Sequence, residues 1–203
     1  MRTGYTFLGQ PTGTSAGTVA AGDHIHSTLA ANSAPDHNYL AWTGEPAVYG
    51  AATTILASNG LMYVARIALR EAKTISTISM YCVVQGATLT SGQNFAALYS
   101  GAGALLSQSV DQSTAWATIG LKAMTLAGPQ AVPAGYVYVG LWGNGTTLPT
   151  FARASHQAAG LSNAGLAAPN LRFATADTGR TTTAPATIGT QTASLIQWWI
   201  ALS

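Results

Sequence analysis

From residue 61 onward, apolar and polar positions alternate along the chain with a period of two residues. Over residues 61–70 the apolar side chains fall on one face, and Arg66 and Arg70 fall on the other. Residues 75–84 repeat the pattern, and one of their faces is formed by Ile78, Met80, Cys82 and Val84. Alternation of this kind predicts strands with one buried face.

Turn residues separate further strands of the same type. Gly101 and Gly103 lie between the apolar segments 94–100 and 104–109, which predicts a β-hairpin. Residues 120–126 predict a shorter strand. The closing segment 194–203 is apolar on both faces, so we expect it to be a central or interfacial strand.

The clearest predicted strand follows Pro133 and Gly135. Along it, Tyr136, Tyr138 and Trp142 share one face, and the other face is formed by Val137, Val139 and Leu141. Because Tyr136, Tyr138, Trp198 and Trp199 lie inside strong strand patterns, we expect them in the core.

Several short strands with turn signals between them predict an all-β fold, an antiparallel β-sandwich or jelly roll, over residues 60–203. Residues 1–59 lack this periodicity and are rich in Gly, Thr, Ser and Ala. They predict an extended, irregular N-terminal region for attachment and trimerisation, because such a segment alone buries too little surface to offset its ordering entropy. Residues 155–170 and 176–193 also lack alternation, and loops of this length are usually functional or packed against another subunit.

The chain is poor in charge, which excludes several function classes. Charged residues make up 7% of the chain, against about 25% in an average soluble domain. The eight basic residues are scattered, so they form no basic stripe for nucleic acid. No run of about 18 apolar residues predicts a membrane span. The single cysteine, Cys82, is expected to be a buried thiol, and Met1 and Arg2 precede polar residues, so we expect no signal peptide.

Two histidines, His24 and His26, stand two positions apart around Ile25. In an extended segment both imidazoles point to the same side, so three chains around an axis would offer six nitrogen ligands to a first-row transition metal. Two solvated loop histidines fit the same spacing.

Catalytic groups are weakly represented. The six acidic residues are isolated in the sequence, whereas glycan hydrolysis normally uses two carboxylates about 5–10 Å apart. Aromatic side chains are the better candidates, because a ring face suits the apolar C–H face of a sugar. Trp116 and Trp142 lie near turn signals, so we expect them to be exposed and able to bind glycans.

Three segments of the predicted sandwich resemble the carboxy-terminal domains of bacteriophage minor tail and tail-fibre proteins, especially from phages of actinobacteria. They are residues 74–109, residues 111–151 and residues 198–203, and the first two include a Gly-Ala-Thr-Leu-Thr-x-Gly-Gln-Asn segment and a Pro-x-Gly-Tyr-x-Tyr-Val segment. The element around His24 and His26 resembles a Gly-x-His-x-His pattern of phage fibres, in which three intertwined chains hold a metal ion on their axis.

This resemblance implies a virion protein made in the host cytoplasm. We expect a short homotrimeric appendage, without enzymatic activity, whose N-terminal region contacts other virion proteins and holds one transition-metal ion per trimer. Its sandwich would bind host cell-surface polysaccharide. A capsid decoration or head-fibre protein that stabilises the shell without a ligand is the alternative, and a glycan depolymerase is a third.

Overall fold

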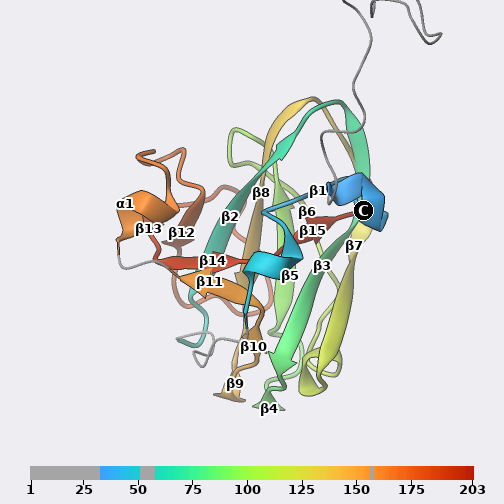
Figure 1. The fold of residues 1–203 in the computed structure, drawn as a ribbon. Coiled ribbons are helices and arrows are strands. Elements are labelled where there is room, and N and C mark those ends of the chain that lie inside the picture. Colours follow the sequence, from blue (N-terminus) through green and yellow to red (C-terminus); the bar gives the residue numbers. More distant parts are fainter. Residues whose placement is uncertain (1–32, 51–57, 156–157) are drawn as a thin grey trace, which may run out of the picture. The chain divides into compact units, whose positions relative to one another are not determined.

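The computed structural model describes residues 33–50, 58–155 and 158–203, and these belong to one compact unit that spans residues 32–203. Two antiparallel sheets form a sandwich (Figure 1). The all-β sandwich predicted from the alternation is thereby confirmed.

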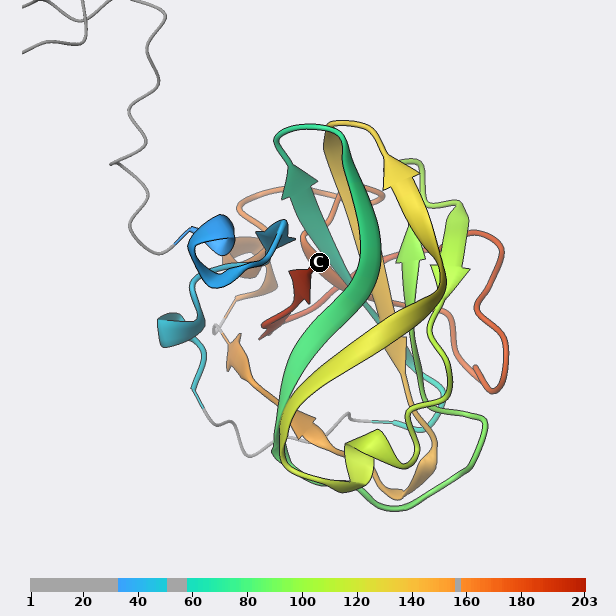
Figure 2. The same cartoon turned by 90° about the vertical axis from the view of Figure 1, so that its right-hand side faces the viewer.

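The first sheet has five strands and is built around the long strand β3. It comprises β1 (Ala41–Trp42), β15 (Ala201–Leu202), β3 (Lys73–Val84), β10 (Thr150–Phe151) and β7 (Gly120–Val132). β15 and β10 pair with one edge of β3, and β7 pairs with the other edge from Lys73↔Val132 to Cys82↔Gly120. In Figure 2, β3 and β7 curve together across the front of the sandwich.

The second sheet has six strands in the order β13-β12-β2-β8-β5-β6. They are β13 (Thr192–Ala193), β12 (Phe173–Ala176), β2 (Met62–Leu69), β8 (Gly135–Trp142), β5 (Phe95–Tyr99) and β6 (Leu105–Gln108). β5 and β6 form the predicted hairpin. Two small ribbons, β4 (Ala87–Leu89) with β9 (Gly145–Thr147) and β11 (Arg153–Ser155) with β14 (Ile196–Trp198), lie outside the two main sheets.

The described helices are short and lie in the connections between strands. They are η2 (Ala34–His37), η3 (Pro46–Val48), η4 (Ala115–Ala117) and α1 (Ala159–Ser162). A capping box joins Ser33 and Asp36 at the start of η2, because the carboxylate of Asp36 accepts bonds from the amide and hydroxyl of Ser33.

The main core lies between the two sheets, on the faces that the alternation predicts. β3 contributes Ile78, Met80 and Cys82, and β8 contributes Val137, Val139 and Leu141. Burial of these side chains removes most of their apolar surface from water, which is the main favourable term in folding.

The opposite face of the six-stranded sheet carries a second, smaller core. Met62, Tyr138 and Trp142 lie there, covered by the segment that includes Ala184 and Ile188. Ala184 and Ile188 of the region 176–193, for which a function or a second subunit was expected, therefore pack against the sheet of their own chain.

The final segment is divided between two partners. β14 pairs with β11, whereas β15 lies between β1 and β3. The predicted central position is confirmed for β15. Since β1 belongs to the sandwich, residues 33–50 are part of this domain, and the boundary expected at residue 60 lies too late in the chain.

Candidate functional site

Residues 33–50 pair with the closing segment at the edge of the five-stranded sheet and help to enclose a hollow on its outward side. The amides of Leu40 and Thr43 donate to the carbonyls of Leu202 and Ile200, at 2.7 and 2.9 Å. The hollow has a volume of about 430 Å³ and is rich in aromatic side chains. We call it the aromatic groove; its lining residues are His37, Tyr39, Pro46, Tyr49, Gly50, Tyr81, Val83, Ala152 and Trp199.

The alternation of side chains along the strands determines which residues face the aromatic groove. Met80 and Cys82 point into the core, so Tyr81, between them, points outward and is 46% exposed. In the same way Trp198 points into the core, whereas Trp199 lines the groove and keeps 6% of its surface exposed. Of these two adjacent tryptophans, Trp198 thus belongs to the core and Trp199 to the groove.

Thr43 holds the backbone on both sides of Trp199. Its hydroxyl donates to the carbonyl of Trp198 at 2.8 Å and accepts from the amide of Ile200 at 3.0 Å. The amide of Trp199 itself donates to the carbonyl of Ala152 at 3.0 Å. These bonds hold the backbone that carries the indole of Trp199 at the base of the groove.

Two tyrosines form further walls. The ring of Tyr39 meets the indole of Trp199 edge-on, with centroids 5.9 Å apart. The hydroxyl of Tyr49 donates to Thr43 at 3.5 Å, and burial raises the pKa of Tyr49, so this phenol stays protonated at neutral pH. Within the described residues, the hydroxyls of Tyr39 and Tyr81 have no protein partner and remain available to a ligand.

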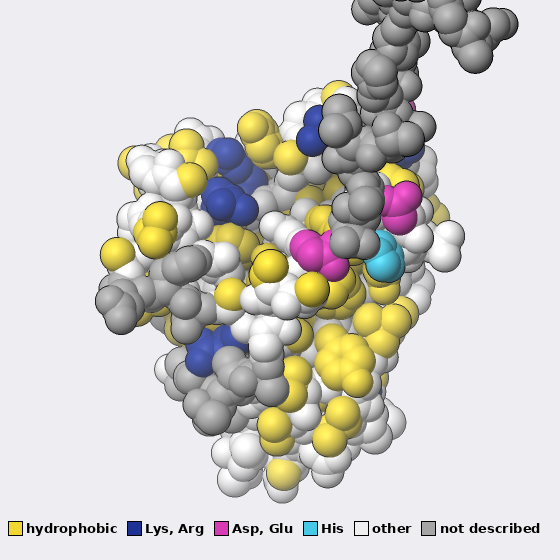
Figure 3. Space-filling view, in the orientation of Figure 1, with side chains coloured by type: hydrophobic (Ala, Val, Ile, Leu, Met, Phe, Trp, Pro, Cys, Tyr) yellow, Lys and Arg dark blue, Asp and Glu magenta, His cyan; other side chains and the backbone are white. Residues whose placement is uncertain are grey.

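Among the described residues that line the aromatic groove there is no lysine or arginine. Figure 3 shows hydrophobic side chains gathered over the lower right of this face, where no lysine or arginine is drawn. Two carboxylates adjoin lining residues in sequence, Asp36 beside His37 and Glu45 beside Pro46. The Oε1 of Glu45 accepts from the amide of Ala47 at 3.5 Å, and its Oε2 is buried without a partner among the described residues. The site is therefore suited to an uncharged or weakly polar ligand.

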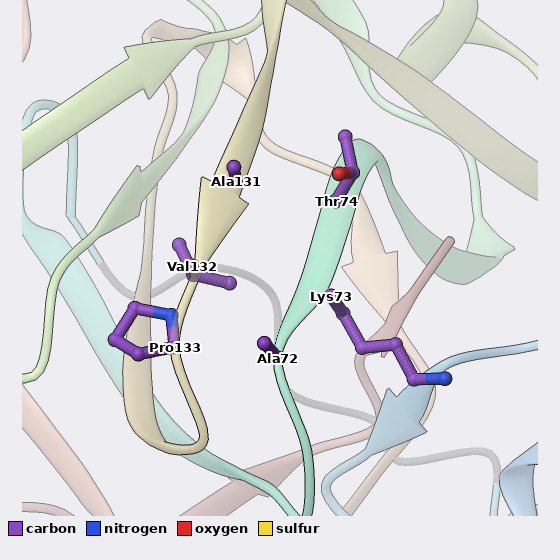
Figure 4. Close-up of a pocket in the computed structure, with 6 residues that line it drawn as sticks. All are labelled: Ala72, Lys73, Thr74, Ala131, Val132 and Pro133. Carbon is purple, nitrogen blue, oxygen red and sulfur yellow. The ribbon is translucent and has the colours of Figure 1, made fainter.

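A second hollow of about 340 Å³ lies where β3 begins and β7 ends (Figure 4). Its lining is mostly small or aliphatic: Ala72, Lys73, Thr74, Ala131, Val132 and Pro133. The side chain of Lys73 extends away from Val132 and Pro133 and pairs with Glu71. This hollow offers neither ring faces nor converging polar groups, so we do not regard it as the functional site.

The two tryptophans expected to bind glycans are buried, which corrects that prediction. Trp116 has no exposed surface and packs edge-on against Phe151, with centroids 5.1 Å apart. Trp142 is equally buried, and its indole donates to the carbonyl of Thr181 at 2.9 Å. Neither can present a ring face to a sugar, because the protein itself occupies both faces.

Of the other aromatic residues that were expected in the core, some are buried and one is exposed. Tyr138 and Trp198 are buried as expected. Tyr136 was expected in the core but is 52% exposed, under the guanidinium of Arg66, which lies 4.1 Å from the ring centroid. His24 and His26 lie outside the described residues.

The described acidic residues each accept a hydrogen bond from a local donor. Asp111 accepts from the amide of Asn94 and the hydroxyl of Ser113, at 3.1 and 3.0 Å, and Asp177 accepts from the amide of Gly189 at 2.9 Å. In residues 33–50, 58–155 and 158–203, no group of three or more histidine, cysteine or acidic side chains is arranged to hold a metal ion. None of the helices in these ranges is long and apolar enough to cross a membrane.

Comparison of the chain with protein-family models, curated proteins and solved structures found no match.

Proposed function

We propose that this chain is a bacteriophage virion protein, a short trimeric surface appendage that binds host cell-surface glycans through the aromatic groove and performs no catalysis. The observation that carries the binding role is the groove itself, in which Tyr39, Tyr49, Tyr81 and Trp199 converge on one hollow. Ring faces bind the apolar C–H faces of sugars, and phenolic hydroxyls bond to sugar hydroxyls.

The virion assignment rests on the resemblance of residues 60–203 to tail and tail-fibre domains. The all-β sandwich and the low charge of the chain are consistent with it. The carboxylates in the described part of the chain each accept a hydrogen bond from a nearby residue, and we find no argument for a glycosidase pair among them.

An uncharged sheet face supports the trimer. The outward side chains of β7 are exposed and carry no charge: Leu121, Ala123, Thr125, Ala127, Pro129 and Ala131. A face of this kind is more typical of a protein contact than of a free surface. We include in the proposal that His24 and His26 of three chains hold one transition-metal ion.

The same face favours the second candidate, a capsid decoration or head-fibre protein. In that function β7 would contact the shell, and the aromatic groove would bind no ligand. Loss of the protein would then lower particle stability and leave adsorption to the host unchanged.

A pull-down on actinobacterial cell walls tests the glycan role. The full chain should sediment with the walls, and mild periodate, which cleaves sugar vicinal diols, should abolish sedimentation. Tyr81→Ala should bind weakly, whereas Tyr136→Ala, which removes an exposed tyrosine elsewhere on the sandwich, should bind like the wild type. Sedimentation that is absent, or that persists after periodate, would contradict glycan binding.

Native mass spectrometry with metal analysis tests the assembly. A trimer with one bound transition-metal ion would support both parts of the assembly proposal. A trimer without metal would contradict the metal-binding role of His24 and His26. A monomer would contradict the proposed trimer.

A further inference from the structure

We propose that the aromatic groove selects among sugars by charge; this inference rests on the proposed glycan-binding function. In this proposal the groove binds a neutral hexopyranose stacked on Tyr81 and discriminates against uronic acids and phosphate-bearing glycans.

Tyr81 is the available stacking platform of the groove. It is 46% exposed, whereas Trp199 keeps 6% and serves as the base. Its backbone is held on both sides, by the pairing with Leu121 of β7 and by the bond from the amide of Ala152 to its carbonyl at 2.8 Å. A ring held in this way binds a sugar without a large ordering cost in the backbone.

The phenolic groups of the groove are uncharged and suit hydroxyls, and the imidazole of His37 also lines it. The phenols of Tyr39 and Tyr81 can each donate and accept one bond, and neither has a partner among the described residues. A pyranose has apolar faces and a rim of hydroxyls, which matches ring faces bordered by phenols. The volume of about 430 Å³ lies within the range of small-ligand sites, about 300–1,000 Å³.

Charge argues against anionic sugars. A carboxylate or phosphate is bound in proteins by arginine, lysine or converging amides, and the described residues of the lining include neither arginine nor lysine, with His37 as their basic side chain. Arg172 acts on Tyr49 only through space and does not line the groove. Asp36 and Glu45, adjacent to the lining residues His37 and Pro46, would repel an anion.

Aromatic residues also bind quaternary ammonium groups such as choline. A site of that kind gains most from a carboxylate that faces the cation. Neither Asp36 nor Glu45 is among the described lining residues; Oδ2 of Asp36 is bonded to the amide and hydroxyl of Ser33, and the free Oε2 of Glu45 is buried. The arrangement therefore favours the neutral sugar over the cation.

Saturation-transfer NMR and calorimetry on the full chain test the proposal. The probes are the methyl glycosides of glucose, galactose, mannose and rhamnose, the methyl glycosides of glucuronic and galacturonic acid, glycerol 3-phosphate and choline. At least one neutral glycoside should bind about tenfold or more tightly than any of the anionic probes. Tyr81→Ala should weaken this binding about tenfold, Tyr81→Phe should retain most of it, and Tyr136→Ala should leave it unchanged.

Three results would overturn the proposal: anionic probes that bind as tightly as neutral ones, choline that binds where neutral glycosides do not, or no binding by any probe. Tyr81→Ala with wild-type affinity would overturn it as well. Failure of this proposal can be distinguished from failure of the proposed function. If cell-wall binding is sensitive to periodate but is inhibited by uronates, glycan binding is supported and only the selectivity for neutral sugars is contradicted. Conversely, the protein could bind a neutral glycoside in a Tyr81-dependent way and yet fail to bind cell walls. That result would support the sugar site and contradict the host-binding function.

Discussion

Replacing Thr43 with valine tests how the base of the aromatic groove is held. The hydroxyl of Thr43 bonds to the backbone of Trp198 and Ile200, at 2.8 and 3.0 Å. Valine keeps nearly the same shape but removes the hydroxyl, so the amide of Ile200 loses its partner in a buried position.

The expected loss of stability can be estimated from the unpaired amide of Ile200. A buried donor left without a partner costs about 1–3 kcal/mol, so we expect the free energy of unfolding to fall by about 2 kcal/mol in Thr43→Val. For a domain of this size, that change lowers Tm by about 4–8 °C. Thr43→Ser keeps the hydroxyl and loses one methyl group, so its loss should stay below about 1 kcal/mol.

Urea unfolding followed by tryptophan fluorescence measures both variants, with the m-value as a check on two-state behaviour. Equal stability of Thr43→Val and the wild type would refute the role of the hydroxyl. A serine variant as unstable as the valine variant would do the same, because the methyl group would then explain the loss. Thr43→Val should also weaken ligand binding, since the bonds that flank Trp199 are gone.

Three further predictions concern other parts of the fold. Gly140→Ala should lower the free energy of unfolding by about 1–3 kcal/mol in urea titrations, because the new Cβ would lie 2.9 Å from Met62 Sδ; an unchanged midpoint would contradict this packing. Burial opposes ionisation of Asp111, but hydrogen bonds, led by the one from Ser113, outweigh it and lower the pKa of Asp111. Its contribution to stability is therefore present above the unfolded pKa, about 3.9, and is lost as pH falls through the lower folded pKa, so the pH dependence of unfolding below about pH 4 should be weaker in Asp111→Asn. Burial raises the pKa of the Cys82 thiol, which has no exposed surface, so a thiol reagent should label the protein only after denaturation, and rapid labelling of the native chain would disprove this.

Local alternation predicted the sandwich well. Met80, Cys82, Val137 and Val139 face the core as the period of two requires, because the direction of a strand side chain depends on its neighbours in sequence. The same rule gives the outward direction of Tyr81.

Exposure near turns was not predictable from local sequence. Trp142 stands at the end of β8, and its outer face is covered by a segment about forty residues later, around Thr181. Packing between residues so far apart in the chain produces no recognisable pattern in the sequence next to Trp142. The aromatic groove was missed for the same reason, since its walls come from Tyr39 and Tyr49 and its base from Trp199.

The bond between Thr43 and Trp198 joins residues 155 positions apart. Closing so long a loop carries a large entropic cost that must be met before the contact forms, and contacts of this separation slow folding. Residues 33–50 should therefore dock late, after the β2–β8 and β3–β7 pairings, and should exchange their amide hydrogens sooner than the central strands. A ligand that spans Tyr39 and Trp199 would hold the two ends of the domain together, so binding would be seen first as slower opening of the N-terminal segment.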